Sequence, residues 1–222
     1  NFSFTECRDG DNVNYPVVVI GAQTWMAENL KTITYRNGVS IGTTIPYNKD
    51  ISAETEPKYQ WAYDGNENNV PVYGRLYTWY AVADMRNVCP TGWHVATDDE
   101  WTTMRDYLIA NGYNFDGTTS GNNVGKSLAS TSNWNSSAVS GAVGNTDYPS
   151  YRNKTGFTAP PGGARGVNGL HGSVGLVGYW WSGTALESTV AWYHYMNSTT
   201  KGINRNTLSK KYGFSVRCVR DY

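Results

Sequence analysis

The stretch TDDEWTTMRDYLIANG, residues 97–112, predicts a helix with both of its ends marked. Thr97 is followed three residues later by Glu100, the capping-box pattern in which each side chain hydrogen-bonds the other residue's backbone N–H. An apolar stripe at helical spacing follows, made by Trp101, Met104 and Leu108. Gly112 suits the left-handed position just past a helix end. We therefore predict a helix over residues 98–110.

Upstream of this helix the pattern predicts two further elements. Residues 73–84, YGRLYTWYAVAD, bring four side chains onto one apolar helical face: Leu76, Trp79, Tyr80 and Ala83. This spacing predicts a second helix. Residues 13–26 are typical of two short strands around a turn at Gly21.

Downstream, residues 111–156 are polar and rich in Gly, Ser, Thr and Asn. We expect a long loop region over about 111–178, which is either a folded loop or a mobile functional surface. If it is folded, four apolar side chains would hold it: Tyr113, Phe115, Leu128 and Trp134. Glycine recurs every third residue over 163–178, without the prolines of collagen and without a phosphate-binding pattern, so we predict tight turns there.

The last part of the chain has the pattern of strands. Four segments fit, which together make the closing strands 179–220: 179–182, 190–196, 203–208 and 212–219. The order of elements predicts one domain over 1–222 with an α+β fold, in which two helices pack on antiparallel sheets and a long loop region intervenes.

Composition excludes several classes of function. Lys and Arg number 18, Asp and Glu also number 18, and the net charge is zero. A protein that neutralises nucleic-acid phosphates or binds a membrane surface needs a basic excess, so we expect no nucleic-acid partner and no direct membrane insertion. Nine Trp and 17 Tyr side chains provide the apolar area for a core.

The sequence favours a location outside the cell. The charge is low, Asn, Thr, Tyr and Trp are abundant, and no apolar run is long enough for a membrane helix. No signal peptide is visible, although a leader or lipid anchor removed before Asn1 stays open. Three cysteines, Cys7, Cys89 and Cys218, allow one disulfide and one free thiol.

No pattern in the sequence marks a metal or catalytic centre. The three histidines, His94, His171 and His194, are far apart and lack zinc-ligand spacing, and we expect them to be neutral with little effect of pH on binding. Residues 64–68, DGNEN, place oxygens at alternate positions but lack the glycine and glutamate of a calcium loop. Calcium stays possible; otherwise we expect no cofactor. A hydrolase using Asp98, Asp99 or Glu100 is the least favoured function, since the capping box already explains these carboxylates.

The closing strands carry the candidate ligand-binding residues. Alternation places Trp192, His194 and Met196 on one face and the candidates Tyr193, Tyr195 and Asn197 on the other. Further candidates lie on the next strand and on the preceding turn: Ile203, Arg205, Asn206, Glu187 and Ser188. Rigid tyrosines with adaptable amides suit protein contacts, and aromatic rings with Asn donors suit sugars. Ordinary core packing under a polar outer face explains the pattern equally well.

Five blocks of sequence also resemble the motifs of one known family, and they follow one another in the same order as in that family. They are YPVVVIGAQTWMAENL (15–30), YGRLYTWYA (73–81), CPTGWHVATDDEW (89–101), GYWWSGT (178–184) and GFSVRCVRD (213–221). Together they cover nearly the whole chain and resemble the Fibrobacter succinogenes major paralogous domain, a family common in surface and secreted proteins, including lipoproteins, of the Bacteroidetes and Fibrobacter group.

The resemblance implies a C-type lectin-like fold. It also implies a disulfide between Cys89 and Cys218, which leaves Cys7 as the spare thiol, and core positions for Trp93, Trp180 and Trp181. The E-P-N, Q-P-D and W-N-D calcium motifs of sugar-binding C-type lectins are missing, so calcium-dependent sugar binding does not carry over. The reactive cysteine pair of formylglycine-generating enzymes is missing too.

From these observations we expect a non-catalytic ligand-binding module, adhesin-like and secreted or on the outer-membrane surface of a bacterium, whose partner is a glycan or a host protein. One alternative is a hypervariable receptor-binding protein diversified by a retroelement, which the Asn, Thr and Ser of residues 197–211 would suit. Another is a structural or fimbrial-tip subunit.

Overall fold

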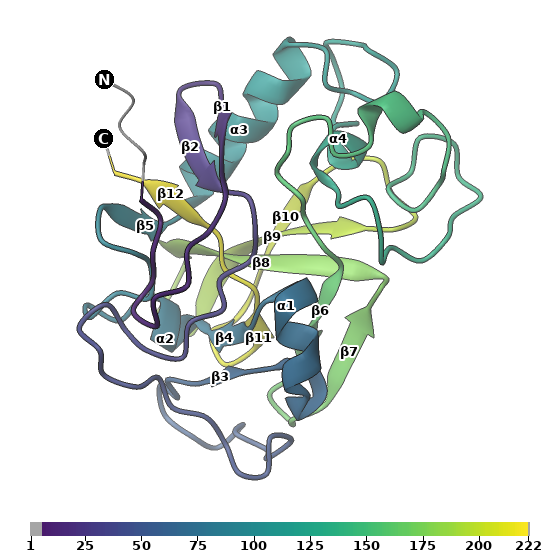
Figure 1. The fold of residues 1–222 in the computed structure, drawn as a ribbon. Coiled ribbons are helices and arrows are strands. Elements are labelled where there is room, and N and C mark those ends of the chain that lie inside the picture. Colours follow the sequence, from purple (N-terminus) through teal and green to yellow (C-terminus); the bar gives the residue numbers. More distant parts are fainter. Residues whose placement is uncertain (1–5, 222) are drawn as a thin grey trace.

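The computed structural model describes residues 6–221 (Figure 1). The strands are β1 (Val17–Ile20), β2 (Gln23–Met26), β3 (Gln60–Trp61), β4 (Leu76–Thr78), β5 (Trp93–Val95), β6 (Gly162–Arg165), β7 (His171–Val174), β8 (Val177–Ala185), β9 (Val190–Asn197), β10 (Asn204–Ser209), β11 (Gly213–Phe214) and β12 (Cys218–Arg220). The α-helices are α1 (Val70–Tyr73), α2 (Trp79–Val82), α3 (Asp98–Ala110) and α4 (Gly125–Leu128), and the 3₁₀ turns are η1 (Tyr63–Gly65), η2 (Glu67–Asn69) and η3 (Pro149–Tyr151). The α+β prediction is confirmed, with strands in the majority; residues 1–5 and 222 of the predicted domain lie outside the described part.

Helix α3 occupies residues 98–110, as its sequence predicts. The Glu100 backbone N–H donates to Thr97 Oγ1 at 3.2 Å, and the Thr97 N–H donates to Glu100 Oε2 at 2.8 Å. The stripe of Trp101, Met104 and Leu108 is fully buried. Capping and burial therefore specify the same 13-residue helix.

The predicted helix over residues 73–84 is wrong for its first half. Helix α1 ends at Tyr73, residues 76–78 form β4, which pairs with β3 on one side and β11 on the other, and α2, residues 79–82, is the helical part of 74–84. The Tyr77 hydroxyl also donates to the Thr32 carbonyl at 2.8 Å. Pairing on both edges of β4 outweighs the local helical spacing, as tertiary context often does for short segments.

Two sheets organise the chain. One has the order β1-β2-β12-β5, and the other has the order β10-β9-β8-β6-β11-β4-β3, with β7 paired to β6. All strand pairs are antiparallel except β6 with β8. The second sheet branches at β6, which bonds to β7, β8 and β11. This branching separates β7 from β8.

The β8–β9–β10 layer runs through the middle of the molecule and has a hydrophobic core on each face (Figure 1). Trp181 and Tyr193 belong to the core that includes β4, α2 and β11. Trp180 and Met196 belong to the core beneath α3, α4 and the β1–β2 hairpin. Burial on both faces leaves few free side chains on this layer, and it confirms that Trp180 and Trp181 are core residues.

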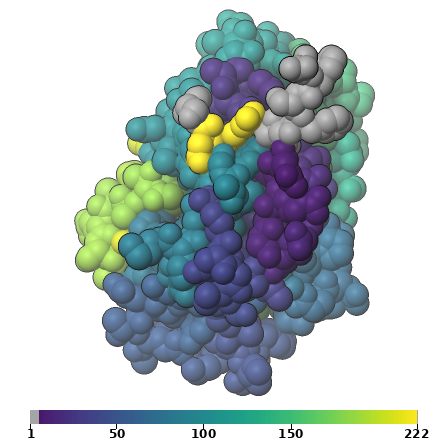
Figure 2. Space-filling view, turned by 60° about the vertical axis from the view of Figure 1, so that its left-hand side comes forward, coloured from purple at the N-terminus to yellow at the C-terminus, as the bar shows by residue number. Residues whose placement is uncertain are grey.

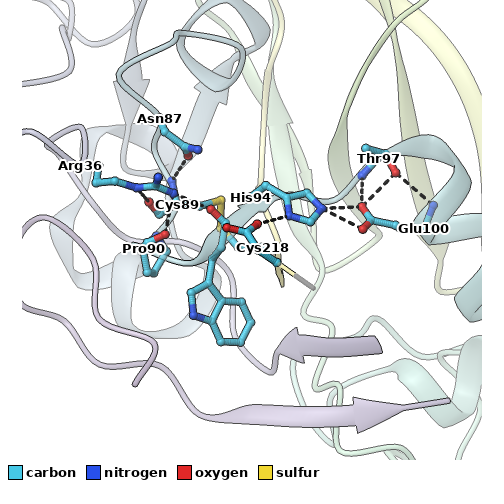
Figure 3. A network of polar contacts seen from close by, with 10 residues as sticks. Arg36, Asn87, Cys89, Pro90, His94, Thr97, Glu100 and Cys218 are labelled. Atoms are coloured by element: carbon cyan, nitrogen blue, oxygen red, sulfur yellow. Dashed lines mark hydrogen bonds and ion pairs between the residues drawn. A yellow bond between two sulfur atoms is a disulfide. The ribbon is translucent and has the colours of Figure 1, made fainter. Parts of the chain in front are cut away.

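The disulfide Cys89–Cys218 joins the segment before β5 to β12, with a Cα–Cα distance of 6.0 Å, as the family resemblance implies. Figure 3 shows how the backbone around Cys89 is held. The Arg36 guanidinium donates to the carbonyls of Cys89 and Pro90, and the Cys89 N–H donates to Asn87 Oδ1. In Figure 2 the C-terminal strand (yellow) lies at the surface close to the N-terminal segment (purple). Cys7 is free and buried.

The segment expected as a long loop, 111–178, is folded. It contains α4, η3, β6 and β7, and its green turns cover the α3 side of the molecule (Figure 1). Phe115 and Leu128 are buried, and Tyr113 and Trp134 pack against the core beneath α3. The Lys126 ammonium is fully buried and donates to the Asn145 carbonyl and to both the carbonyl and the carboxylate of Asp147.

Three of the six regularly spaced glycines have positive φ: Gly163, Gly169 and Gly175. A β-carbon at Gly163 would lie 2.4 Å from the carbonyl oxygen of Gly172 across the β6–β7 pair. The tight-turn interpretation is therefore confirmed at Gly169 and Gly175, whereas Gly163 lies within β6, where the close approach of β7 requires glycine.

Candidate ligand-binding site

A groove of about 320 Å³ lies where β7 separates from β8. Strands β6 to β11 and the segments between them supply its walls. Its lining residues are Ala164, Gly166, Leu170, His171, Gly172, Ser173, Tyr179, Tyr193, Leu208, Tyr212 and Phe214. The branching of the sheet at β6 thus creates a hollow lined by four aromatic rings, those of Tyr179, Tyr193, Tyr212 and Phe214.

Aromatic rings form the floor of the groove. Phe214 is buried, stacks on Tyr179 with ring centroids 4.9 Å apart and planes 10° apart, and lies 4.9 Å from Tyr193. Tyr212 packs 6.1 Å from Phe214. Tyr179 and Tyr212 are half-buried, so their rings reach the surface. Such a floor offers flat apolar area with phenol hydroxyls at its margin.

No Asp, Glu, Lys or Arg lines the groove. Burial, with Tyr179 and Tyr195 nearby, raises the pKa of Tyr193 to about 12, and burial also raises the pKa of Tyr179. Burial lowers the pKa of His171 below its ordinary value, although Asp64 opposes this. At neutral pH the groove therefore presents uncharged donors and acceptors, which suit an uncharged ligand surface.

The wall formed by β7 has unusual backbone features. Ser173 has φ of +65°, a conformation that costs energy for a residue other than glycine and that is often found at binding sites. Its neighbour Gly172 is exposed, and a β-carbon there would meet no atom within 4 Å. The wall is therefore open at Gly172, where a larger side chain would narrow the groove without a clash.

Only one of the predicted contact residues, Tyr193, lines this groove. Tyr195 lies beside it, half-buried and 5.8 Å from the Tyr193 ring. Asn197 is half-buried and accepts from the backbone N–H and the hydroxyl of Thr199, both at 2.9 Å. Asn197 therefore shapes the β9–β10 turn.

Arg205, a further predicted contact residue, does not lie on the same face of the layer as the tyrosines. Arg205 pairs in register with His194, and Asn206 pairs with Tyr193. The Arg205 guanidinium bonds to Asp98 and lies 4.4 Å from the ring centroid of Trp192. It thus lies on the α3 side of the layer, while Asn206 is exposed on the groove side.

Ile203 was expected to contact ligand, but only 2% of it is exposed and it lies in the core beneath α3. Glu187 and Ser188 are exposed in the β8–β9 turn, at the opposite end of β9 from Asn197. The eight predicted residues therefore do not form one site. The groove residues that were missed are contributed by separate segments, above all Ser173, Tyr179, Tyr212 and Phe214.

The three carboxylates considered for a hydrolase lie at the start of α3, on the side away from the groove. Asp98 is bonded to His194 Nε2 at 2.9 Å and to Arg205. Burial alone would raise the pKa of Asp98, but the bonds and charges of His194 and Arg205 have the larger effect and lower it. Glu100 is bonded to His94 and Thr97. Asp99 is exposed. Two of the three are therefore engaged in structural contacts.

The expectation of neutral histidines is wrong for His94 (Figure 3). Its Nε2 lies 2.8 Å from Glu100 Oε1 and its Nδ1 lies 2.7 Å from Asp221 Oδ1. The hydrogen bond with Glu100, assisted by Asp221, raises the pKa of His94 to about 9. By contrast, burial lowers the pKa of His194, against the effect of Asp98.

Within residues 6–221, no three His, Cys, Asp or Glu side chains come together as metal ligands. No helix in that range has the length and apolar character needed to cross a bilayer. Residues 64–68, which were compared with a calcium loop, lie in the two consecutive 3₁₀ turns η1 and η2.

The fold and the groove together define a disulfide-closed α+β domain with an uncharged aromatic hollow at the branch of its sheet. The Fibrobacter succinogenes major domain matches residues 18–220, nearly the whole chain. The chain belongs to this family, as its five sequence blocks predict. No curated protein and no solved structure matches this chain.

Proposed function

We propose that this domain is a non-catalytic ligand-binding module, and that it contacts a glycan or a protein on another surface through the aromatic groove. The observation that carries the proposal is the combination of four aromatic rings with no formal charge in one hollow of about 320 Å³. Concave, mostly apolar sites with a few polar groups are the usual form of a binding site. Sugar rings and apolar side chains both complement such a surface.

The test is binding of the purified domain to arrays of glycans and of extracellular host proteins, with and without calcium. A hit is then measured with Gly172→Leu, which adds a side chain to the open wall of the groove. We expect Gly172→Leu to abolish binding while its melting temperature stays close to that of the wild type.

The matched control is Tyr107→Ala, which removes a partly exposed tyrosine from α3, on the other side of the molecule. It should bind as the wild type does. Binding that survives Gly172→Leu, or that is lost equally in Tyr107→Ala, would rule out the groove. If the domain binds to nothing on any of the arrays, that result would count against a binding role altogether.

We also propose that the α+β arrangement is a form of the C-type lectin-like fold. In support, β1 near the start of the chain and β12 near its end share one sheet, and a long-range disulfide closes β12 onto the segment before α3. An experimental structure that superposes β1, β12, α3 and the β8–β10 layer on a lectin domain would support this, and a different strand order would refute it.

A hypervariable receptor-binding protein is the second candidate, and the position of β10 favours it. This strand lies at the edge of its sheet, and Arg205 and Asn206 are exposed on opposite faces. An edge strand with exposed side chains accepts many substitutions without disturbing a core. The test is the gene's neighbourhood, where a reverse transcriptase and a near-copy of the segment should be found; their absence would eliminate this candidate.

A secreted or surface location on a bacterium, with or without a lipid anchor, is part of the proposal. The Cys89–Cys218 bond supports it, because disulfides persist mainly outside the reducing cytosol. Fractionation of the source bacterium with an antibody against the domain tests it, and recovery in the cytosol alone would contradict it.

A further inference from the structure

A second hollow, of about 350 Å³, lies on the other side of the β10–β11 connection from the groove. The turn between β8 and β9 forms one wall, and the segments around α2 and before β3 form the others. In Figure 2 the lime-green surface, which includes this turn, lies against the blue and teal of those segments. Lys210 lies in this hollow, and Tyr212, two residues later, lies in the groove. The two hollows are therefore neighbours along the chain.

Lys210 is the unusual residue of this second hollow. Only 5% of it is exposed, and its ammonium makes one hydrogen bond, to the Ser188 carbonyl at 3.0 Å. It also lies 4.2 Å from the ring centroid of Trp79. Among residues 6–221 no carboxylate lies within 4.0 Å of it, whereas buried ammonium groups are normally paired. Donor capacity toward an anion therefore remains.

The other charges in the hollow do not neutralise Lys210. The Asp84 carboxylate is bonded to Lys58 at 2.7 Å and to Arg86 at 2.8 Å. Both bonds lower the pKa of Asp84, and the bond to Arg86 has the larger effect. Glu56 also lines the hollow, and it is exposed. Lys58 is 46% exposed. Two ammonium groups thus border the hollow, and of these Lys58 is paired with Asp84 whereas Lys210 has no carboxylate partner among residues 6–221.

Aromatic and apolar surface adjoins these ammonium groups. Trp79 and Tyr80 are half-buried, line the hollow and pack edge to face at 6.5 Å, and Met85 is 97% exposed at its margin. The Trp79 indole N–H donates to the Ser182 carbonyl at 2.9 Å, which fixes the ring. A ring held in place beside an ammonium group that still has free N–H donors is suited to a ligand that joins a flat group to an anion.

We propose that this hollow binds a small molecule in which a carboxylate is attached to a ring, with the carboxylate on Lys210 and Lys58 and the ring beside Trp79 and Tyr80. The ring is that of an aromatic acid or of a sugar acid. This site is separate from the groove, and it stands whether or not the groove binds a glycan or a protein.

The experiment follows the indole N–H signal of Trp79 by NMR while benzoate or glucuronate is added, with benzyl alcohol and glucose as the uncharged counterparts. We expect one of the two acids to give a saturable shift, with a dissociation constant on the order of 1 mM, and its uncharged counterpart to give none. The acid that binds identifies the kind of ring. Equal shifts with an acid and its neutral counterpart, or no saturable shift with either acid, would overturn the proposal.

Variants test the assignment of the ammonium groups. Lys210→Met keeps an apolar stem over Trp79 and removes the charge, so we expect at least about tenfold weaker binding of the acid. Lys58→Met changes a half-exposed residue and should also weaken binding, which keeps the test valid if Lys210→Met fails to fold. The matched control is Lys154→Met, which removes another ammonium that lies over tyrosine rings, far from this hollow. Unchanged affinity in both Lys210→Met and Lys58→Met would overturn the proposal.

Discussion

His94 lies between two carboxylates and connects the first turn of α3 to the residue after β12. Its Nε2 is 2.8 Å from Glu100 Oε1, and Glu100 is also the capping-box residue of the helix. Its Nδ1 is 2.7 Å from Asp221 Oδ1. A protonated imidazole donates from both nitrogens, so this arrangement holds the charged form.

Because of this arrangement, the free energy of unfolding depends on pH between pH 6.5 and about pH 9. The folded pKa of His94, about 9, exceeds the ordinary value of 6.5, so its contribution is complete below pH 6.5 and is lost as the pH rises through 9. We expect the free energy of unfolding to fall by about 1–2 kcal/mol over this window, after allowance for partial exposure. Urea unfolding at several pH values measures it.

The control for this prediction is His94→Gln, which has no titrating group at the position. Its unfolding free energy should change much less than that of the wild type between pH 6.5 and 9. Asp221→Asn should fall between the two. Identical pH profiles for the wild type and His94→Gln would disprove the assignment.

The disulfide gives a second prediction. Cys89 and Cys218 are 129 residues apart, and closing so long a loop stabilises the folded state by at most about 4–5 kcal/mol in the chain-entropy model. Cys89→Ser with Cys218→Ser should lose much of this in urea unfolding. A loss below about 1 kcal/mol would contradict the expectation.

The thiol of Cys7 provides a third prediction. Burial, with Asp9 nearby, raises the pKa of Cys7 to about 12, so little thiolate forms at neutral pH. We expect no alkylation in the folded protein and one alkyl group per chain in denaturant without reductant, by intact mass. Rapid labelling in native buffer would show that Cys7 is accessible.

Local sequence predicted α3 because its cap, its apolar stripe and its terminal glycine lie within 16 residues and act within one helix. The segment 76–78 was mistaken for helix because its strand pairing involves β3 and β11, which are distant in sequence. The disulfide was implied by family resemblance, since three cysteines alone leave the pairing open.

The groove could not be predicted from any single segment. Ser173, Tyr179, Tyr193 and Phe214 meet because the sheet branches at β6, and nothing near these residues encodes the branch. Alternation along β9 was predicted correctly, but it does not reveal that both faces are covered. The register of β10 against β9 likewise decides that Arg205 faces α3, and spacing within β10 carries no information on that register.

Lys126 gives a fourth prediction, about the folded segment 111–160. Its buried ammonium lies 2.6 Å from the Asn145 carbonyl, and 2.8 Å from both the carbonyl and Oδ1 of Asp147. Lys126→Met leaves the carbonyl and Oδ1 of Asp147 without a donor, while the Asn145 carbonyl keeps its bond from Arg152, and we expect a loss of about 3 kcal/mol in stability. Lys201→Met, at a half-buried lysine near Phe115, is the control and should change little.

Because an ammonium already binds these three oxygens, we expect calcium or a chelator to leave the melting temperature of the wild type unchanged. A rise in melting temperature with calcium that is larger in Lys126→Met than in the wild type would show that the loop oxygens can bind the metal in competition with the ammonium.

A fifth prediction separates substitutions that β10 accepts from those that it does not. Ile203 precedes β10, is buried beneath α3, and has its carbonyl held by the Asn122 amide at 2.6 Å, so Ile203→Ala should cost about 2–5 kcal/mol. Asn206 is exposed on the edge strand, so Asn206→Ala should change stability by less than about 0.5 kcal/mol. Denaturant unfolding compares the two. If diversification does act on this segment, Ile203 has to stay apolar while Asn206 is free to vary, because only the first supports the core; equal costs for the two substitutions would remove the structural basis for that role.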